Sequence, residues 1–373
     1  MLFSRQMNIR RQTTHLFYCV LSLSFAACAF AQVPTPLEIV SETKLPRDVY
    51  DTVAIGGLNK DIQCDAEENV WIPGLRGYSD TFSSLVRFGP NKATVHVDID
   101  RDRRLENGSI EYFSPLRNGG VLALVRTAAE YNELDGSPTK PKRYADTYAV
   151  TFGPSGKISS IVQLRVPSSA GKITALARLK NGWLAAGYTY ESESIAMQAY
   201  LFDPAGNFTK EVVLPENRTK SSRTGTAGSR AVFRPTALTT ADGNVLVFRG
   251  FSGQLLYRFS ETGKLLESKR LHPDGIDFAS PRLIGNSLLV NADVPDEKIG
   301  DLDGIPIVRS RSAFPIFDLK TGKMTEVLTW MDQGTVGCFN GTRLLIFKQG
   351  VGSGTWRILT LEPAGHKMQG PRS

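Results

Sequence analysis

Phe202-Asp203-Pro204-Ala205-Gly206 is the clearest of six copies of one short phrase, in which an apolar strand end runs into a turn rich in Gly, Pro and small polar residues. The copies start 44 to 64 positions apart. A period in this range indicates a repeat architecture built from one supersecondary unit. The other five copies begin at Phe88, Phe152, Phe259, Phe317 and Leu361.

A second turn follows in every repeat, and its clearest forms are Asn118-Gly119-Gly120, Asn181-Gly182 and Asp242-Gly243-Asn244. Asn-Gly and Asp-Gly pairs adopt the positive φ of tight hairpin turns readily. The run after each turn is aliphatic or β-branched, as in Val245-Leu246-Val247-Phe248, which is typical of a strand buried on both faces. Each repeat therefore predicts four antiparallel strands, A to D, with tight A–B and C–D turns.

Six repeats of this kind predict an all-β fold, a six-bladed β-propeller with four-stranded antiparallel blades. A two-sheet sandwich is the alternative, but it does not explain why the same two turns alternate six times. Residues 37–46 have the character of a D strand yet precede the first A strand, so we expect them to complete the last blade and close the ring. The expected blades span residues 59–100, 109–167, 172–215, 234–273, 277–330 and 332–368.

Residues 1–31 have the features of a signal peptide. Arg5, Arg10 and Arg11 precede an apolar stretch of about 15 residues, and Ala29-Phe30-Ala31 fits a signal peptidase site. That stretch is shorter than the ~20 residues that span a bilayer. We expect cleavage after Ala31 and export to the periplasm or out of the cell. An uncleaved anchor and lipidation at Cys28 are the alternatives.

Removing residues 1–31 lowers the formal net charge from +7 to +4. This mild charge, without bases interleaved with aromatic residues, argues against a nucleic-acid partner. No further apolar run has membrane-spanning length, so the sequence predicts no membrane span in the mature chain.

Two cysteines remain in the expected mature chain, Cys64 and Cys338. Each lies six positions before the first apolar residue of a B strand, in the first and last repeats, which are neighbours in a closed ring. An oxidising compartment permits a disulfide between them. Equivalent positions on adjacent strands could instead exceed the ~7 Å Cα limit for a bridge, so two buried free thiols are the alternative.

The long connections are expected on one side of the ring, at residues 100–109, 126–147, 215–234 and 291–313. Long loops in a compact fold commonly carry function, so this long-loop face is the expected ligand side. The A strands begin there, around the mouth of the central channel. Six charged residues lie near those starts: Asp61, Glu111, Lys172, Arg234, Asp277 and Asp332.

The four carboxylates in this set are Asp61, Glu111, Asp277 and Asp332. They could hold Ca²⁺ or another divalent cation through oxygen ligands. They could also raise one another's pKa and act as acid or base. Salt bridges with the basic members of the set are the structural alternative.

The stretch Asp61 to Ile72, which ends Asn69-Val70-Trp71-Ile72, resembles an NHL-type propeller repeat, and Thr239 to Leu246 is similar. The resemblance implies the six-bladed group that includes NHL proteins and the regucalcin/gluconolactonase-like hydrolases. Three readings of function follow. The first is binding of a small molecule, glycan or protein on the long-loop face. The others are a metal-dependent lactonase or arylesterase, and a structural module of an envelope assembly.

Overall fold

The computed structural model of the 373-residue chain describes fifteen stretches of it, and the expected signal peptide lies outside them. Within the described part, no helix combines the length and apolarity needed to cross a membrane. The described residues are 33–45, 62–65, 67–75, 82–89, 94–106, 108–128, 144–190, 194–216, 218–220, 235–249, 254–271, 279–302, 305–332, 335–349 and 356–364.

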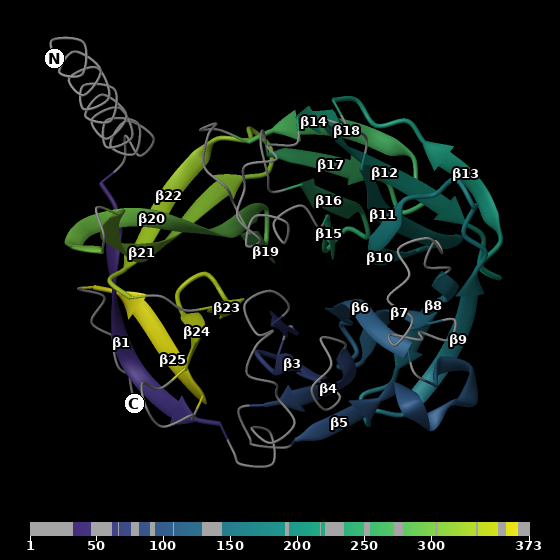
Figure 1. Ribbon diagram of the computed structural model, residues 1–373, viewed down its shortest axis with the longest axis horizontal. Coiled ribbons are helices and arrows are strands. Elements are labelled where there is room, and N and C mark those ends of the chain that lie inside the picture. Colours follow the sequence, from purple (N-terminus) through teal and green to yellow (C-terminus); the bar gives the residue numbers. More distant parts are fainter. Residues whose placement is uncertain are drawn as a thin grey trace, which may run out of the picture.

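The fold is all-β, with four-stranded antiparallel sheets in a propeller-like arrangement around a common centre (Figure 1). The first sheet contains β2 (Gln63–Cys64), β3 (Val70–Leu75), β4 (Phe82–Phe88) and β5 (Val95–Asp98). Two short 3-10 helices follow it, η1 (Ile99–Arg101) and η2 (Arg103–Leu105). The second sheet contains β6 (Gly108–Pro115), β7 (Val121–Ala128), β8 (Tyr144–Phe152) and β9 (Ile158–Leu164).

The next two sheets repeat this antiparallel order. The third contains β10 (Lys172–Leu179), β11 (Gly182–Tyr190), β12 (Ser194–Phe202) and β13 (Phe208–Val212), with β14 (Arg218–Lys220) also paired to β12. The fourth contains β15 (Thr236–Thr239), β16 (Val245–Arg249), β17 (Leu255–Phe259) and β18 (Leu265–Arg270).

The remaining strands form one eight-stranded sheet, where the sequence predicted two separate blades. Its order is β19-β20-β21-β22-β1-β25-β24-β23. The first half contains β19 (Ala279–Ile284), β20 (Ser287–Leu302), β21 (Ile305–Asp318) and β22 (Met324–Trp330). The second half contains β1 (Thr35–Lys44), β25 (Trp356–Pro363), β24 (Leu344–Gln349) and β23 (Thr335–Phe339).

The N-terminal strand β1 joins these halves. It pairs antiparallel with β25 along most of its length, from Leu37↔Pro363 to Lys44↔Arg357, as expected for a strand that completes the last repeat. Figure 1 shows purple β1 beside yellow β25. Its pairing with β22 is parallel and consists of two residue pairs, Thr35↔Leu328 and Pro36↔Thr329.

Apolar side chains fill the seams between successive sheets. Trp71 and Phe113 belong to the core between the first and second sheets, and Trp183 and Tyr257 to the core that joins the second, third and fourth. The two halves of the eight-stranded sheet also pack face to face, because Phe314 of β21 shares a core with Leu359 of β25. Further cores join the fourth sheet to the first half and the second half to the first sheet.

The innermost strands contact one another in a closed ring. Contacts run from β2 to β6, β10, β15, β19 and β23, and from β23 back to β2. The first strand of every repeat therefore faces the centre of the molecule, as a propeller arrangement requires.

The recurring C–D turn carries glycine at positive φ in four repeats: Gly156, Gly206, Gly263 and Gly322 have φ of 77°, 86°, 85° and 71°. Glycine is also required at this turn because the neighbouring sheet leaves no room for a side chain. A Cβ on Gly206 would lie 2.0 Å from the carbonyl oxygen of Gln163 on the preceding sheet. The backbone N–H of Arg165 donates to Gly206 O at 2.8 Å. The turn motif that defines the repeat thus also fixes how one sheet packs on the next.

The expected long loop at residues 291–313 is instead the end of a two-stranded ribbon made by β20 and β21. The ribbon stays paired from Ser287↔Asp318 to Leu302↔Ile305. Pro295, Gly300 and Pro306 favour a loop in the sequence. They are compatible with strands here because β21 pairs with β22 only from Ser312 onward and β19 pairs with β20 no further than Asn291, which leaves one side of each strand without a ladder in the described part. The expected loop 100–109 holds η1 and η2, while much of 126–147 and 215–234 lies outside the described residues.

Candidate functional site

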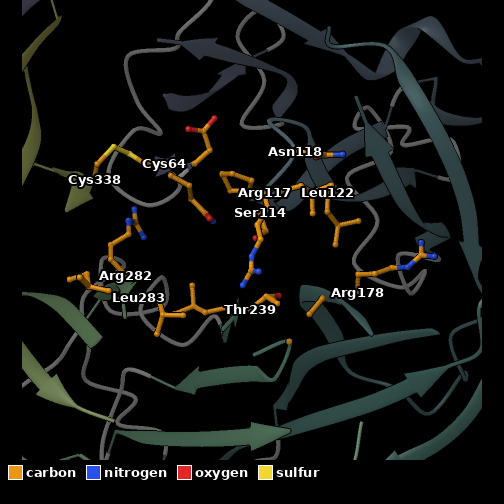
Figure 2. A pocket seen from close by; sticks show the side chains of 18 of the residues that line it. Cys64, Ser114, Arg117, Asn118, Leu122, Arg178, Thr239, Arg282, Leu283 and Cys338 are labelled. Carbon is orange, nitrogen blue, oxygen red and sulfur yellow. A yellow bond between two sulfur atoms is a disulfide. The ribbon is translucent and has the colours of Figure 1, made fainter. Parts of the chain in front are cut away.

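A cavity of about 1010 Å³ lies at the centre of the ring (Figure 2). Every innermost strand contributes to its wall, from β2 and β6 through β10 and β15 to β19 and β23. Residues of the A–B turns line it as well, among them Glu68, Asn118, Gly243 and Asn340. The cavity therefore lies on the tight-turn side of the ring, opposite the face that the sequence favoured.

The cavity wall combines aliphatic and polar side chains. Leu116, Leu176, Leu238, Leu283 and Phe339 supply apolar surface from five of the six repeats. Polar groups interrupt that surface, and Figure 2 shows Ser114 and Thr239 among the side chains around the hollow. Apolar walls with a few polar groups are the usual composition of a small-molecule site.

Two long side chains reach across the ring beside the cavity. The Tyr112 hydroxyl of β6 donates to Ala237 O of β15, passing the intervening strand β10. Burial raises the pKa of Tyr112 to about 12, so the hydroxyl stays protonated as a donor. Arg282 of β19 donates to Ile62 O next to β2 and, at 2.9 Å, to Gly337 O of β23. These two bridges tie innermost strands of different sheets together beside the cavity.

Charged groups at the rim are largely engaged with neighbours. Glu68 accepts from Asn340 Nδ2 at 2.5 Å, which links the first and last repeats. Lys180 Nζ lies 3.3 Å from Glu261 Oε1. Arg117 donates from Nη2 to Thr240 O at 3.0 Å. The rim carboxylates Glu68 and Glu261 are therefore held in place by partners on neighbouring repeats.

Cys64 and Cys338 line the cavity and form a disulfide, with their Cα atoms 5.3 Å apart. Both cysteines lie six positions before the first apolar residue of the next strand, but they do not occupy equivalent positions in the strand pairing. Cys64 pairs with the first residue of β3, Val70, whereas Cys338 pairs with the second residue of β24, Leu345. The β23–β24 turn sets this offset, because Phe339↔Leu344 and Cys338↔Leu345 share one register; the register then shifts between Cys338 and Val336. The bridge joins the first and last repeats at the wall of the cavity.

The structure describes three of the six predicted channel-mouth residues: Glu111, Lys172 and Asp332. Glu111 and Lys172 meet, with Nζ 3.4 Å from Oε2. Asp332 forms its own ion pair with Lys348. Among the described residues, no three His, Cys, Asp or Glu side chains gather as a metal site would require. Asp61, Arg234 and Asp277 lie outside the described residues.

Sequence reasoning did not find the central cavity. Its lining residues come from the ends of A strands, where Gln63, Ser114 and Thr239 read as ordinary strand positions. The available signal was that polar residues recur near the ends of the A strands. The lengths of the loops instead favoured the long-loop face as the ligand side.

No protein-family model matches the chain, and no curated protein matches it. Among solved structures, a protein of unknown function from Bacteroides caccae is similar over 74% of this chain and 83% of its own, at 10% identity and a TM-score of 0.44. Hydrazine synthase of Kuenenia stuttgartiensis covers 79% and 74%, at 11% identity and 0.39. A chain of the mitotic checkpoint complex covers 89% and 94%, at 7% identity and 0.42. Likenesses at this level carry no functional assignment.

Proposed function

We propose that this chain is an exported, six-bladed propeller that binds a small molecule in its central cavity. The observation that carries the proposal is the cavity itself. Its volume of about 1010 Å³ is at the upper end of the usual range for ligand pockets, and all six innermost strands build it. A mixed wall of leucine, phenylalanine and hydroxyl side chains suits a ligand with an apolar body and polar ends.

Six blades follow if the eight-stranded sheet is counted as two. Only two residue pairs join its halves, between β1 and β22. The halves share a core as facing sheets do, and each contributes one strand, β19 or β23, to the inner ring. Two four-stranded blades joined at a corner by the closing strand account for these observations.

A bulky side chain placed in the cavity should weaken ligand binding. Thr239 lies on the cavity wall, and a tryptophan at this position occupies space without charge. With the amphipathic fluorescent dye anilinonaphthalene sulfonate as probe, we expect saturable binding to the folded protein and a loss of roughly tenfold in affinity for Thr239→Trp, about 1.4 kcal/mol. Dye fluorescence titration measures both.

Thr262→Trp is the matched control, since Thr262 is exposed in a C–D turn and does not line the cavity. It should bind the dye as the parent protein does. Equal dye binding by Thr239→Trp and the parent would remove the central cavity from consideration.

If the chain is exported, its mature form should begin at a defined residue. The full chain produced in a cell with a secretory pathway should be recovered outside the cytoplasm with Gln32 as its first residue, because Ala29 and Ala31 provide the small side chains of the cleavage site. N-terminal sequencing checks this. A recovered chain that still begins at Met1, or one that stays in the cytoplasm, would contradict export.

The other sequence-based readings remain predictions. They are a partner on the long-loop face, a metal-dependent hydrolase and an envelope module. Metal content of the purified protein, with and without chelator, tests the hydrolase reading directly.

A further inference from the structure

A second hollow, of about 420 Å³, lies on the long-loop side between the second and third sheets. Its wall combines the ends of β7 and β9, the start of β8, and the connector from β9 to β10. It shares no lining residue with the central cavity. The lining residues are Arg126, Asp146, Thr147, Gln163, Leu164, Arg165, Val166, Pro167, Ser168, Ala170, Gly171, Lys172 and Ile173.

Arg126 lies in this hollow because of strand alternation. Side chains two apart on a strand share a face, and Leu122 and Leu124 of β7 belong to the core shared with the third sheet. Arg126 is the next residue on that face and is only 8% exposed. The apolar stripe along this seam therefore ends in a buried guanidinium group.

Two further cations line the same hollow. Arg165 extends from the end of β9 and is exposed, and Lys172 is the first residue of β10. Lys172 forms an ion pair with Glu111, in which Nζ lies 3.4 Å from Oε2. The lining carboxylate, Asp146, accepts from Gln163 Nε2 at 2.8 Å and from the Tyr148 hydroxyl at 3.3 Å. The described lining residues therefore include three cations and one carboxylate, which is a positive excess.

The connector that forms one wall is held in place by the third sheet. The backbone N–H of Gly171 donates to Gln198 Oε1 at 2.9 Å. A Cβ on Gly171 would lie 2.3 Å from Tyr188 O, so the chain approaches β11 too closely for any side chain. At its other end, Arg165 N donates to Gly206 O. A wall fixed in this way reduces the ordering cost of binding.

We propose that this seam pocket is a second binding site, for a compact oxyanion such as a carboxylate or phosphate group. Arg126 contacts the anion from the base of the pocket and Arg165 from its rim. Guanidinium groups match the planar, two-oxygen geometry of these anions. The attraction is stronger at a buried arginine than at the surface because the local dielectric constant is lower. The pocket volume is within the usual range for a small ligand.

Isothermal titration calorimetry with inorganic phosphate, and separately with succinate, tests the site when ionic strength is held constant. We expect saturable binding of at least one probe to the intact protein. Arg165→Glu should weaken that binding at least tenfold, and Arg126→Gln should weaken it further. Arg103→Glu makes the same charge change at an exposed arginine outside the pocket, and it should leave the affinity unchanged within about twofold.

Binding of phosphate alone or of succinate alone supports the site and identifies its anion. Absence of saturable binding with both probes would overturn the proposal, as would equal weakening by Arg103→Glu and Arg165→Glu. If Arg126→Gln does not fold, Arg165→Glu decides the question, since Arg165 is exposed. Thr239→Trp should leave anion affinity unchanged, so failure of the central cavity and failure of the seam pocket are distinguishable.

Discussion

Replacing Cys64 and Cys338 by serine should lower the free energy of unfolding by about 5 kcal/mol. The two residues are 274 positions apart, so their bridge closes most of the chain into one loop. In the chain-entropy account, such a loop removes many conformations from the unfolded state. A loss of this size corresponds to a fall in melting temperature on the order of 10 °C. Urea unfolding of Cys64→Ser, Cys338→Ser and the double variant measures it.

Chemical reduction of the disulfide provides the controls for this prediction. Dithiothreitol should destabilise the parent protein to the level of the double variant and leave the double variant unchanged. Denatured, unreduced mature protein should show no reactive thiol. Two reactive thiols, or a double variant as stable as the parent, would show that the bridge does not form in solution.

Gly206→Ala should be among the most damaging small substitutions in the turns, at about 3 kcal/mol. Its φ of 86° costs an alanine about 1–2 kcal/mol. The added Cβ would also lie 2.0 Å from Gln163 O, which is backbone and has no rotamer to move away. Overpacking of this kind adds roughly 1–3 kcal/mol.

Gly285→Ala separates the two causes. Gly285 also has positive φ, 53°, but nothing lies within 4 Å of a Cβ built on it. We expect it to cost only the backbone part, about 1–2 kcal/mol. Denaturant unfolding of both variants gives the comparison. Equal losses would mean that the turn glycines do not control docking between sheets.

The sheet order inside each repeat could be predicted because its causes are local. Turns such as Asn118-Gly119 and Asp203-Pro204 prefer conformations set by their own residues, and the apolar runs between them have the length of strands. The pairing of residues 37–46 with the last strand followed from counting strands. The register of β23 could not be predicted by counting, because it shifts between Val336 and Cys338.

The candidate sites were less accessible to sequence reasoning. Glu111 and Lys172 were expected at the channel mouth and do meet, but the central cavity lies at the opposite mouth. The bridge from Tyr112 to Ala237 joins residues 125 apart on strands that are not neighbours in the ring. No local pattern encodes such a contact, because it depends on the final spacing of the inner strands.

The sequence by itself determined that this protein is built from repeated four-stranded units with glycine turns, because φ preferences and side-chain alternation act within a few residues. Only the tertiary structure decided where cavities remain between the packed sheets. A central cavity and a seam pocket exist where packed sheets fail to meet, and that depends on strand tilt and on long side chains such as Arg282 and Arg126 that reach between sheets. The joining of the last eight strands was likewise a tertiary outcome, since one edge of β1 met β22.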